Sequence, residues 1–278
     1  MGEDVRTRQV GAATVTIINI GDVQEDLNQW FVLSEAERAS DAALWAKPAR
    51  LPIQCIHIAA PGVSVLVDAG LYDYPPNAPQ LIPGYQPPLD LCASLVKHQI
   101  KPDEIQHVII THAHGDHFNA LTALREGQYT ACFPNARHYL GRADWEAAQK
   151  ALEEPNSLES HTFGVLNQQG LLEWVDQPHD LGNGVQIIPA PGESPGHQVV
   201  RLHSEGQTLY CIGDLYHLTA EVEHPTWVVR WTNGEANQHS RRTFNEAAID
   251  ENALLVATHI APLGRLARTA TGYTWVDQ

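Results

Sequence analysis

The sequence predicts a layered α/β fold, and three observations support this fold class. Short apolar runs rich in β-branched residues recur along the 278 residues, which is typical of buried strands. Segments with helical spacing separate some of these runs. Hydrophobic residues make up 43% of the chain, enough for a large core. Strands mixed with helices on this scale favour sheets covered by helices.

The expected elements follow in chain order. Eight runs predict strands: TVTIINI (14–20), IQCIHIA (53–59), VSVLVDAG (63–70), HVIITH (107–112), VQIIPAPG (185–192), QVVRLH (198–203), TLYCIGD (208–214) and LLVATH (254–259). Three segments predict helices: 89–99, 142–154 and 240–252, the last with Ser240 as its N-cap.

Two segments lack a regular pattern. Residues 21–52 are acidic and carry Trp30 and Trp45, and the second segment, 71–88, is rich in proline. Loops of this length act as lids, binding loops or interface arms, or they cover part of the core. No repeat or long polar linker divides the sequence, so we expect one domain over residues 1–278.

Charge and composition exclude several partners. The formal net charge of -16 disfavours nucleic acid, because phosphate binding depends on lysine and arginine. No apolar run reaches the roughly 18 residues that a membrane span requires. The first residues carry charge and lack the apolar core of a secretory signal, so we expect a cytoplasmic protein without a membrane partner. The four cysteines show no C-x-x-C pairing and are expected to be buried. An oligomer is compatible with the sequence.

The hexapeptide HAHGDH follows a predicted strand and predicts a metal site. It places His112, His114, Asp116 and His117 on a tight loop, and Gly115 allows the loop to turn sharply. Crowding these side chains together has a cost in desolvation and hydrogen-bond demand that metal binding would offset.

Three further positions repeat the pattern of metal-capable side chains near strand ends, where ligands collect in α/β sheets. Asp214 and His259 end predicted strands, and His197 lies in a proline- and glycine-rich turn before another. The pooled ligands are His112, His114, Asp116, His117, His197, Asp214 and His259. Seven exceed the four that one zinc ion takes, so we expect two divalent ions. The imidazole and carboxylate set favours zinc, and iron, cobalt or manganese would fit the same ligands.

HAHGDH also matches the H-x-H-x-D-H signature of the metallo-β-lactamase-fold hydrolases, and the later ligands follow in that family's order. The segments FPNARHYLGRADWEAA and THIAPLGRLARTATGYTW resemble the branch that contains quorum-quenching lactonases and parathion-hydrolase-like enzymes. The resemblance implies an αββα sandwich with two similar halves, about 1–165 and 166–278. It also implies one metal on His112, His114 and His197, a second on Asp116, His117 and His259, and Asp214 as the bridge between them.

Two nearby carboxylates are not ligands in this resemblance. Many lactonase-like members have histidine where this sequence has Glu193, so we expect Glu193 to affect the lining of the pocket. Asp68 ends the predicted strand 63–70. We expect its carboxylate to orient a ligating imidazole by accepting that ring's other N–H; an ordinary contact at a strand end is the alternative.

These features predict a dinuclear metallohydrolase that attacks a neutral ester with a hydroxide bridging the two metals. A small lactone of the acyl-homoserine lactone type is the first choice of substrate. Phe118, Trp227, Trp231, Tyr72 and Tyr85 would line an apolar pocket, or belong to the core. A phosphotriester or aryl ester is the alternative substrate.

Three residues are candidates for direct catalytic roles. Asp116 would orient the hydroxide and carry its proton to the leaving group. His217 or Tyr216 would donate a hydrogen bond to the developing oxyanion. Some lactonases of the family have a tyrosine three residues after the bridging aspartate, where this chain has His217. His217 is favoured if the chain turns directly after Asp214, and Tyr216 if the strand continues. A third alternative is that both side chains only pack within the loop.

Other classes of function are less well supported. Oxygen-reducing relatives carry a di-iron site with glutamate in place of the motif's second histidine, and the thiol dioxygenases use a single iron, but here His114 is present and the ligand set is complete. A protein that binds metal without catalysis is a further alternative. A β-lactamase would usually need export, for which no signal is visible.

Overall fold

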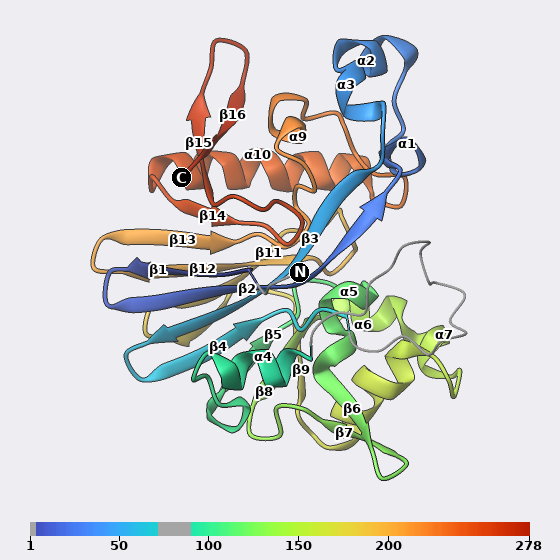
Figure 1. Cartoon of the computed structure of the whole chain (residues 1–278), viewed down its shortest axis with the longest axis vertical. Helices are drawn as coiled ribbons and strands as arrows, with labels where there is room; N and C mark the ends of the chain where they lie inside the picture. Colours follow the sequence, from blue (N-terminus) through green and yellow to red (C-terminus); the bar gives the residue numbers. More distant parts are fainter. Residues whose placement is uncertain (1–3, 72–89) are drawn as a thin grey trace.

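Two seven-stranded sheets form the centre of the computed structural model, which describes residues 4–71 and 90–278 (Figure 1). The first sheet has the order β1-β2-β3-β4-β5-β8-β9 and the second runs in sequence order from β10 to β16. The strands of the first sheet are β1 (Asp4–Val10), β2 (Ala13–Glu25), β3 (Ala49–Ala60), β4 (Val63–Val67), β5 (His107–Ile109), β8 (Arg137–Gly141) and β9 (Leu172–Val175). Those of the second are β10 (His179–Gly182), β11 (Val185–Pro189), β12 (Gln198–Ser204), β13 (Gln207–Cys211), β14 (Leu254–Val256), β15 (Gly264–Arg268) and β16 (Tyr273–Asp277).

Helices cover the outer face of each sheet. The long helix α10 and the short α9 lie on the second sheet, whereas α4 to α8 and the hairpin β6–β7 lie with the first (Figure 1). The α-helices are α1 (Leu27–Trp30), α2 (Glu35–Ser40), α3 (Ala42–Trp45), α4 (Leu91–Lys97), α5 (Gly115–Phe118), α6 (Arg142–Ala147), α7 (Gln149–Leu152), α8 (Val165–Gln168), α9 (Ala220–Glu223) and α10 (Gly234–Asp250). The hairpin is formed by β6 (Thr122–Arg125) and β7 (Gln128–Ala131). Two short 3₁₀-helices, Pro102–Glu104 and Asn119–Leu121, and a π-helix, Ser160–Gly164, complete the described elements.

Three apolar clusters separate the layers. Neighbouring residues on β2 point to opposite faces, because Ile17 joins the cluster between the two sheets and Ile18 joins the cluster beneath the helices of the first sheet. A third cluster, which includes Phe244 and Ala248 of α10, fills the space between the second sheet and that helix. This order of helix, sheet, sheet and helix confirms the predicted layered α/β class and the αββα sandwich. That the chain forms one domain of two similar halves stays a prediction.

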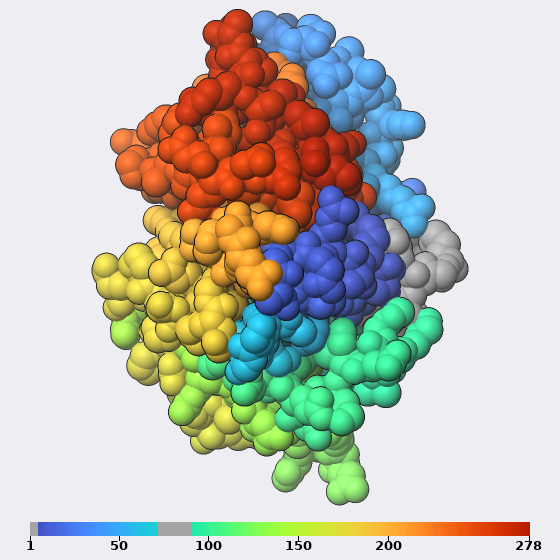
Figure 2. All heavy atoms as spheres, turned by 90° about the vertical axis from the view of Figure 1, so that its left-hand side faces the viewer, coloured from blue at the N-terminus to red at the C-terminus, as the bar shows by residue number. Residues whose placement is uncertain are grey.

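The start of the chain joins the two sheets. In Figure 2 the start of the chain, in dark blue, lies between orange atoms of the C-terminal half and cyan and green atoms of the first half. The turn of this hairpin is tied to the second sheet, where the Ala12 backbone N–H donates to Ser204 Oγ at 3.0 Å. Parallel pairing occurs twice, along β4–β5–β8–β9 and between β13 and β14, and ligands of α/β sheets collect at the carboxyl ends of such strands.

Each of the eight predicted runs contains a strand, but β13 ends at Cys211 and β14 at Val256, so Asp214 and His259 lie in the loops that follow and do not end the strands as predicted. The helix predictions need two corrections. The segment 142–154 forms two short helices, α6 and α7, instead of one. Ser240 is not an N-cap, because α10 begins at Gly234 and Asn233 caps it by accepting from the Ala236 backbone N–H. The Ser240 hydroxyl instead donates to the Pro191 carbonyl oxygen at 2.7 Å.

The segment 21–52 is more regular than the sequence suggested. It contains the end of β2, the helices α1, α2 and α3, and the start of β3. Apart from Leu71, the second irregular segment lies outside the described residues, together with Tyr72 and Tyr85. No helix of the described residues is long and apolar enough to cross a membrane.

Candidate metal centre

The HAHGDH segment leaves β5 and places its imidazoles beside the end of the second sheet. The strand β5 ends at Ile109, and the short helix α5 begins at Gly115. His112 and His117 are fully buried, whereas the side chain of His114 is 39% exposed. The loop therefore buries two of its imidazoles and turns the third toward solvent.

The first cluster of polar atoms contains His112, His114 and Glu193. His112 Nε2 lies 2.9 Å from His114 Nδ1. The two Glu193 oxygens are each 3.2 Å from one of these nitrogens, Oε2 from His112 and Oε1 from His114. Two ring nitrogens so close together need a proton or a cation between them, because two nitrogen lone pairs repel. The Glu193 carboxylate thus contacts two of the predicted ligand imidazoles.

The second cluster surrounds one oxygen of Asp214. Its Oδ2 lies 3.3 Å from His117 Nε2, 3.2 Å from His259 Nε2 and 3.8 Å from His112 Nε2. Asp116 closes the group, with Oδ2 at 3.2 Å from His259 Nε2 and Oδ1 at 3.7 Å from His117 Nε2. Asp214 thus lies between the nitrogens of three imidazoles that come from both sheets.

His197 lies next to this group. Its Nδ1 contacts the Ala190 carbonyl oxygen at 3.1 Å, and its Nε2 accepts from the Asp214 backbone N–H at 3.3 Å. Its ring centroid lies 5.3 Å from that of His112. The preceding Gly213 has φ +52, and a Cβ there would lie 3.0 Å from His197 Nε2. Glycine at this position therefore lets the Asp214 loop approach the His197 ring.

Asp68 makes the predicted contact with an imidazole of the HAHGDH motif. Asp68 Oδ2 accepts from His117 Nδ1 at 2.8 Å and from Thr111 Oγ1 at 2.8 Å, and Oδ1 accepts from the Thr111 backbone N–H at 2.7 Å. A similar bond holds His259, whose Nδ1 donates to the Pro52 carbonyl oxygen at 2.9 Å. Both bonds fix the ring so that Nε2 faces the cluster.

Asp144 positions two of the loops, and sequence reasoning missed it. Its carboxylate accepts from the Ala113 backbone N–H at 2.9 Å, from Ser194 Oγ at 2.8 Å and from the Gly196 backbone N–H at 2.6 Å. These bonds join the HAHGDH loop to the loop that carries Glu193 and His197. The only signal in the sequence was an acidic residue in the predicted helix 142–154, which is the usual place for a solvated carboxylate.

Of the two candidate oxyanion donors, only His217 faces the cluster. His217 Nε2 lies 3.4 Å from Asp214 Oδ2, and the His217 backbone N–H donates to Glu221 Oε2 at 2.6 Å. The Tyr216 hydroxyl instead donates to Asn245 Oδ1 at 2.9 Å, on α10. The proposal of Tyr216 as a donor is therefore corrected: β13 ends at Cys211 and the chain turns at once, so alternation does not extend to Tyr216.

Carboxylates raise the pKa of two buried imidazoles, those of His217 and His259. Burial by itself lowers the pKa of His217, but Asp214 and then Glu221 raise it to about 9. Burial also opposes protonation of His259, whose pKa is raised to about 10 by Asp214 and Asp116. The cluster thus attracts positive charge, which protons or metal ions can supply.

Two tryptophans form a wall beside these residues. The Trp30 ring lies 5.7 Å from that of His217 and 5.3 Å from that of Trp231. Trp231 also lies 6.1 Å from the His114 ring and is 42% exposed. Trp227 and Phe118, the other described aromatics considered for a pocket, are buried in the core. Trp30 comes from the segment 21–52, so that segment contributes to the site.

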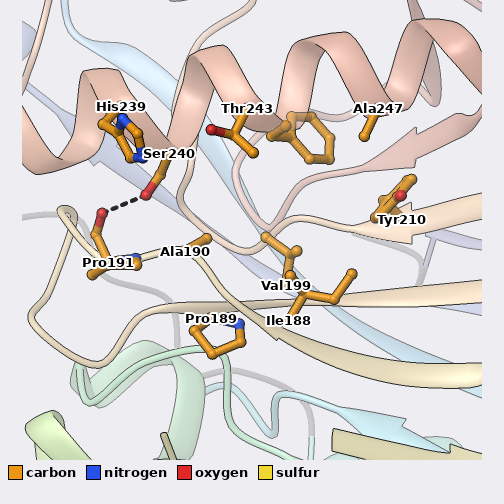
Figure 3. Close-up of a pocket in the computed structure, with 11 residues that line it drawn as sticks. Ile188, Pro189, Ala190, Pro191, Val199, Tyr210, His239, Ser240, Thr243 and Ala247 are labelled. Carbon is orange, nitrogen blue, oxygen red and sulfur yellow. Dashed lines mark hydrogen bonds between the residues drawn. The ribbon is translucent and has the colours of Figure 1, made fainter. Parts of the chain in front are cut away.

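A separate cavity of about 330 Å³ lies between α10 and the second sheet (Figure 3). Its lining is mostly apolar, with Ile188, Val199 and Phe244 among the residues that form it. Figure 3 shows the bond from Ser240 to Pro191, which fixes the start of the Glu193 loop against α10.

The chemistry of the clusters fits divalent metal ions. Several buried atoms have no hydrogen-bond partner among the described residues: His117 Nε2, Asp214 Oδ1, Glu193 Oε2, and His217 Nδ1 and Nε2. Buried polar atoms without partners have a high desolvation cost. Because they are imidazole nitrogens and carboxylate oxygens that converge on a small volume, metal ions would satisfy them.

Comparisons with known proteins agree with this chemistry. A family model described as the metallo-beta-lactamase superfamily matches residues 49–259. An N-acyl homoserine lactonase from Bacillus cereus is 26% identical over 165 residues, which cover 56% of this chain and 60% of that relative. The match thus spans less than two thirds of the length of that curated relative.

Two solved structures show the same fold. AidC, described as a dizinc quorum-quenching lactonase in complex with a product, superposes with a TM-score of 0.80 at 19% identity, over 99% of this chain and 98% of that one. The hydrolase AbOPH, described as a member of the beta lactamase superfamily, gives a TM-score of 0.82 at 15% identity, over 100% of this chain and 98% of that one.

Proposed function

Because the chain belongs to the metallo-β-lactamase superfamily, we propose that it is a hydrolase that holds two divalent metal ions and cleaves a neutral ester. The first ion would be held by His112, His114 and His197, and the second by Asp116, His117 and His259. Asp214 would bridge the two. One observation carries this proposal: buried Asp214 keeps Oδ1 without a hydrogen-bond partner among the described residues while Oδ2 faces several imidazole nitrogens.

When bound, two such ions lower the pKa of a shared water toward neutrality and polarise an ester carbonyl. Zinc suits this mixture of imidazole and carboxylate, and iron, cobalt or manganese are the alternatives.

Asp116 is the proposed proton carrier. It contacts His259 on one side, and its side chain is 27% exposed, so it reaches both the cluster and the open side of the site. A carboxylate in this place can take the proton of the attacking water and deliver it to the leaving alkoxide oxygen.

His217 is the proposed donor to the developing oxyanion. Its ring is buried and faces Asp214, and two backbone N–H groups, those of His217 and Leu218, donate to Glu221 Oε2. Arg241 pairs with the other Glu221 oxygen. The donor is therefore held in place before substrate binds, as electrostatic stabilisation requires.

The wall formed by Trp30 and Trp231 favours a substrate with an apolar group beside its ester. An acyl-homoserine lactone combines a small cyclic ester with an apolar acyl chain, and two of the similar proteins are described as lactonases. The net charge of -16 disfavours polyanionic substrates. We therefore propose a lactone substrate of this type.

A substrate comparison at equal metal loading tests the proposal. We expect kcat/KM for N-hexanoyl homoserine lactone to exceed that for a simple aryl ester or a phosphotriester by at least about tenfold, a difference within the range that pocket contacts provide. A chelator should abolish all turnover. If the protein prefers the phosphotriester or the aryl ester, that compound would take the place of the lactone as the proposed substrate. If the metal-loaded protein hydrolyses none of the three, the hydrolase assignment is contradicted.

A further inference from the structure

We propose that the Glu193 carboxylate is an additional ligand of the metal ion held by His112 and His114. This inference rests on the metal centre proposed above, but not on the substrate. Glu193 Oε2 lies 3.2 Å from His112 Nε2, and Oε1 lies 3.2 Å from His114 Nδ1. These atoms form one convergent group, and a second group joins Glu193 to Asp214 and His217. The carboxylate thus faces the same volume as the imidazole nitrogens.

The burial of Glu193 requires a positive partner. The residue is 1% exposed, and its Oε2 has no hydrogen-bond partner among the described residues. A buried ionised carboxylate is unstable when one of its oxygens accepts no hydrogen bond and no cation neutralises its charge. A cation between Glu193, His112 and His114 would satisfy all three side chains, and it would also separate the two imidazole nitrogens that lie 2.9 Å apart.

The surrounding loop holds Glu193 in this orientation. Trp231 Nε1 donates to Oε1 at 2.8 Å and leaves Oε2 directed at the cluster. The preceding Gly192 has φ +140, and a Cβ there would lie 2.2 Å from the Asn237 backbone nitrogen. Only glycine allows the loop to approach α10 this closely. The carboxylate is therefore placed by fixed backbone and by one side-chain bond.

A ligand in this position changes the charge of the site. With Asp116 and Asp214 alone, two carboxylates offset two of the four positive charges of two divalent ions, and Glu193 would offset a third. Carboxylate oxygen is a harder ligand than imidazole nitrogen, so Glu193 shifts the first site toward manganese or iron(II) relative to zinc. It also raises the affinity for any divalent ion in that site.

The test uses metal binding, so it needs no substrate. We would compare the parent protein with Glu193→Gln, which keeps the size of the side chain and an acceptor for Trp231 but removes the charge. Glu25→Gln is the matched control, because Glu25 is a half-buried carboxylate that accepts a hydrogen bond from Trp30 and whose pKa is affected by the charges of Asp116 and His259. Glu193→Asp is the second variant, which keeps the charge but withdraws the carboxylate.

Chelator competition and the absorption spectrum of the cobalt-substituted protein are the readouts. We expect Glu193→Gln to weaken binding of one of the two ions at least about 10–100-fold, the loss that even an indirect metal contact causes. The cobalt bands should change in Glu193→Gln and in Glu193→Asp, and both readouts should stay at the parent level in Glu25→Gln.

A crystal structure of the metal-loaded parent gives the direct measurement. We expect a Glu193 oxygen about 2.0–2.2 Å from the first ion. A parent protein with two bound ions whose affinity and cobalt spectrum are unchanged by Glu193→Gln would overturn this inference alone. A loss equal in Glu193→Gln and Glu25→Gln would show a general charge effect and would also overturn it. A parent protein that binds no metal would overturn the proposed function as well.

Discussion

Asp68 and Asp214 occupy similar places in two parallel strand pairs, but their surroundings differ. Asp68 follows β4, which pairs with β5, and Asp214 follows β13, which pairs with β14. The partner strand of each pair leads to a histidine of the cluster, His112 after β5 and His259 after β14. Both carboxylates are buried, at 1% and 3% exposure.

The difference lies in their hydrogen-bond partners. Both oxygens of Asp68 accept bonds from the protein, through Thr111 and His117. Asp214 keeps Oδ1 unpartnered among the described residues, and its Oδ2 faces the Nε2 atoms of several imidazoles. Burial of a carboxylate at a strand end is therefore not by itself the mark of a metal ligand. The unfilled acceptor capacity of Asp214 is what indicates a cation.

The largest expected effect belongs to Asp214→Asn. Loss of this charge should lower turnover by more than about a hundredfold, beyond the 10–100-fold that loss of an indirect metal contact causes. The apolar strands remain, so the free energy of unfolding of the metal-free protein should change far less. Steady-state kinetics and urea unfolding measure both. If the variant binds two ions and turns over substrate at the parent rate, Asp214 is not the bridging ligand.

His217→Ala should lower kcat/KM by about a hundredfold at equal metal occupancy, because it removes an oxyanion donor. Tyr216→Phe is the control from the adjacent position. Its hydroxyl bonds Asn245, so we expect kcat/KM within about threefold of the parent and a loss of about 1 kcal/mol in stability. If kcat/KM falls by no more than about threefold in either variant, neither side chain is the oxyanion donor, and the metals alone would stabilise the oxyanion.

Asp68→Asn tests the other member of the comparison. The variant weakens the acceptor of His117 Nδ1, so metal affinity should fall about tenfold, at the lower end of the effect of such contacts. Metal stoichiometry at saturation should stay at the parent value. If the variant binds only one ion at saturating metal, Asp68 is itself a ligand. The hydrogen-bond partners of Asp68 and Asp214 would then not distinguish a ligand from a supporting residue.

The last prediction concerns pH and the metal-free protein. The pKa of His259 is about 10 and that of His217 about 9, both raised from 6.5 by carboxylates that include Asp214. A raised folded-state pKa contributes stability that is fully present below pH 6.5 and is lost as pH rises through 9 to 10. The free energy of unfolding should therefore fall over this range in the metal-free parent, and less in Asp214→Asn. If the free energy of unfolding depends on pH equally in the two proteins, Asp214 does not stabilise the protonated forms of His217 and His259.

Much of the fold was predictable because its central strands are buried on both faces. The strands β4 and β14 have the mostly apolar sequences VSVLV and LLV, and each of the eight predicted runs contains a strand. Strands of mixed composition, among them β8 and β15, were not predicted. Their arginines and glycines interrupt the run of apolar residues on which the strand predictions depend. The start of α10 was missed because its first turns are polar and contain glycine, although Asn233 caps them.

The site was predictable where a side chain lies in the loop just after a strand or belongs to a dense motif. The convergence of HAHGDH with Asp214 and His259 follows from the order of parallel strands. The contacts of Glu193 and Asp144 were not foreseen, because they depend on how separate loops pack together. The choice between His217 and Tyr216 depended on where β13 ends, and sequence patterns locate strand ends poorly.

The number of metal ions per chain tests the central claim most directly. Elemental analysis of metal-saturated protein, after removal of loosely bound ions, should give two divalent ions per chain, because imidazoles from both sheets surround Asp214. His259→Ala should reduce this to one, since the second ion loses a ligand. One ion per chain in the parent, with the content unchanged in His259→Ala, would contradict the dinuclear centre.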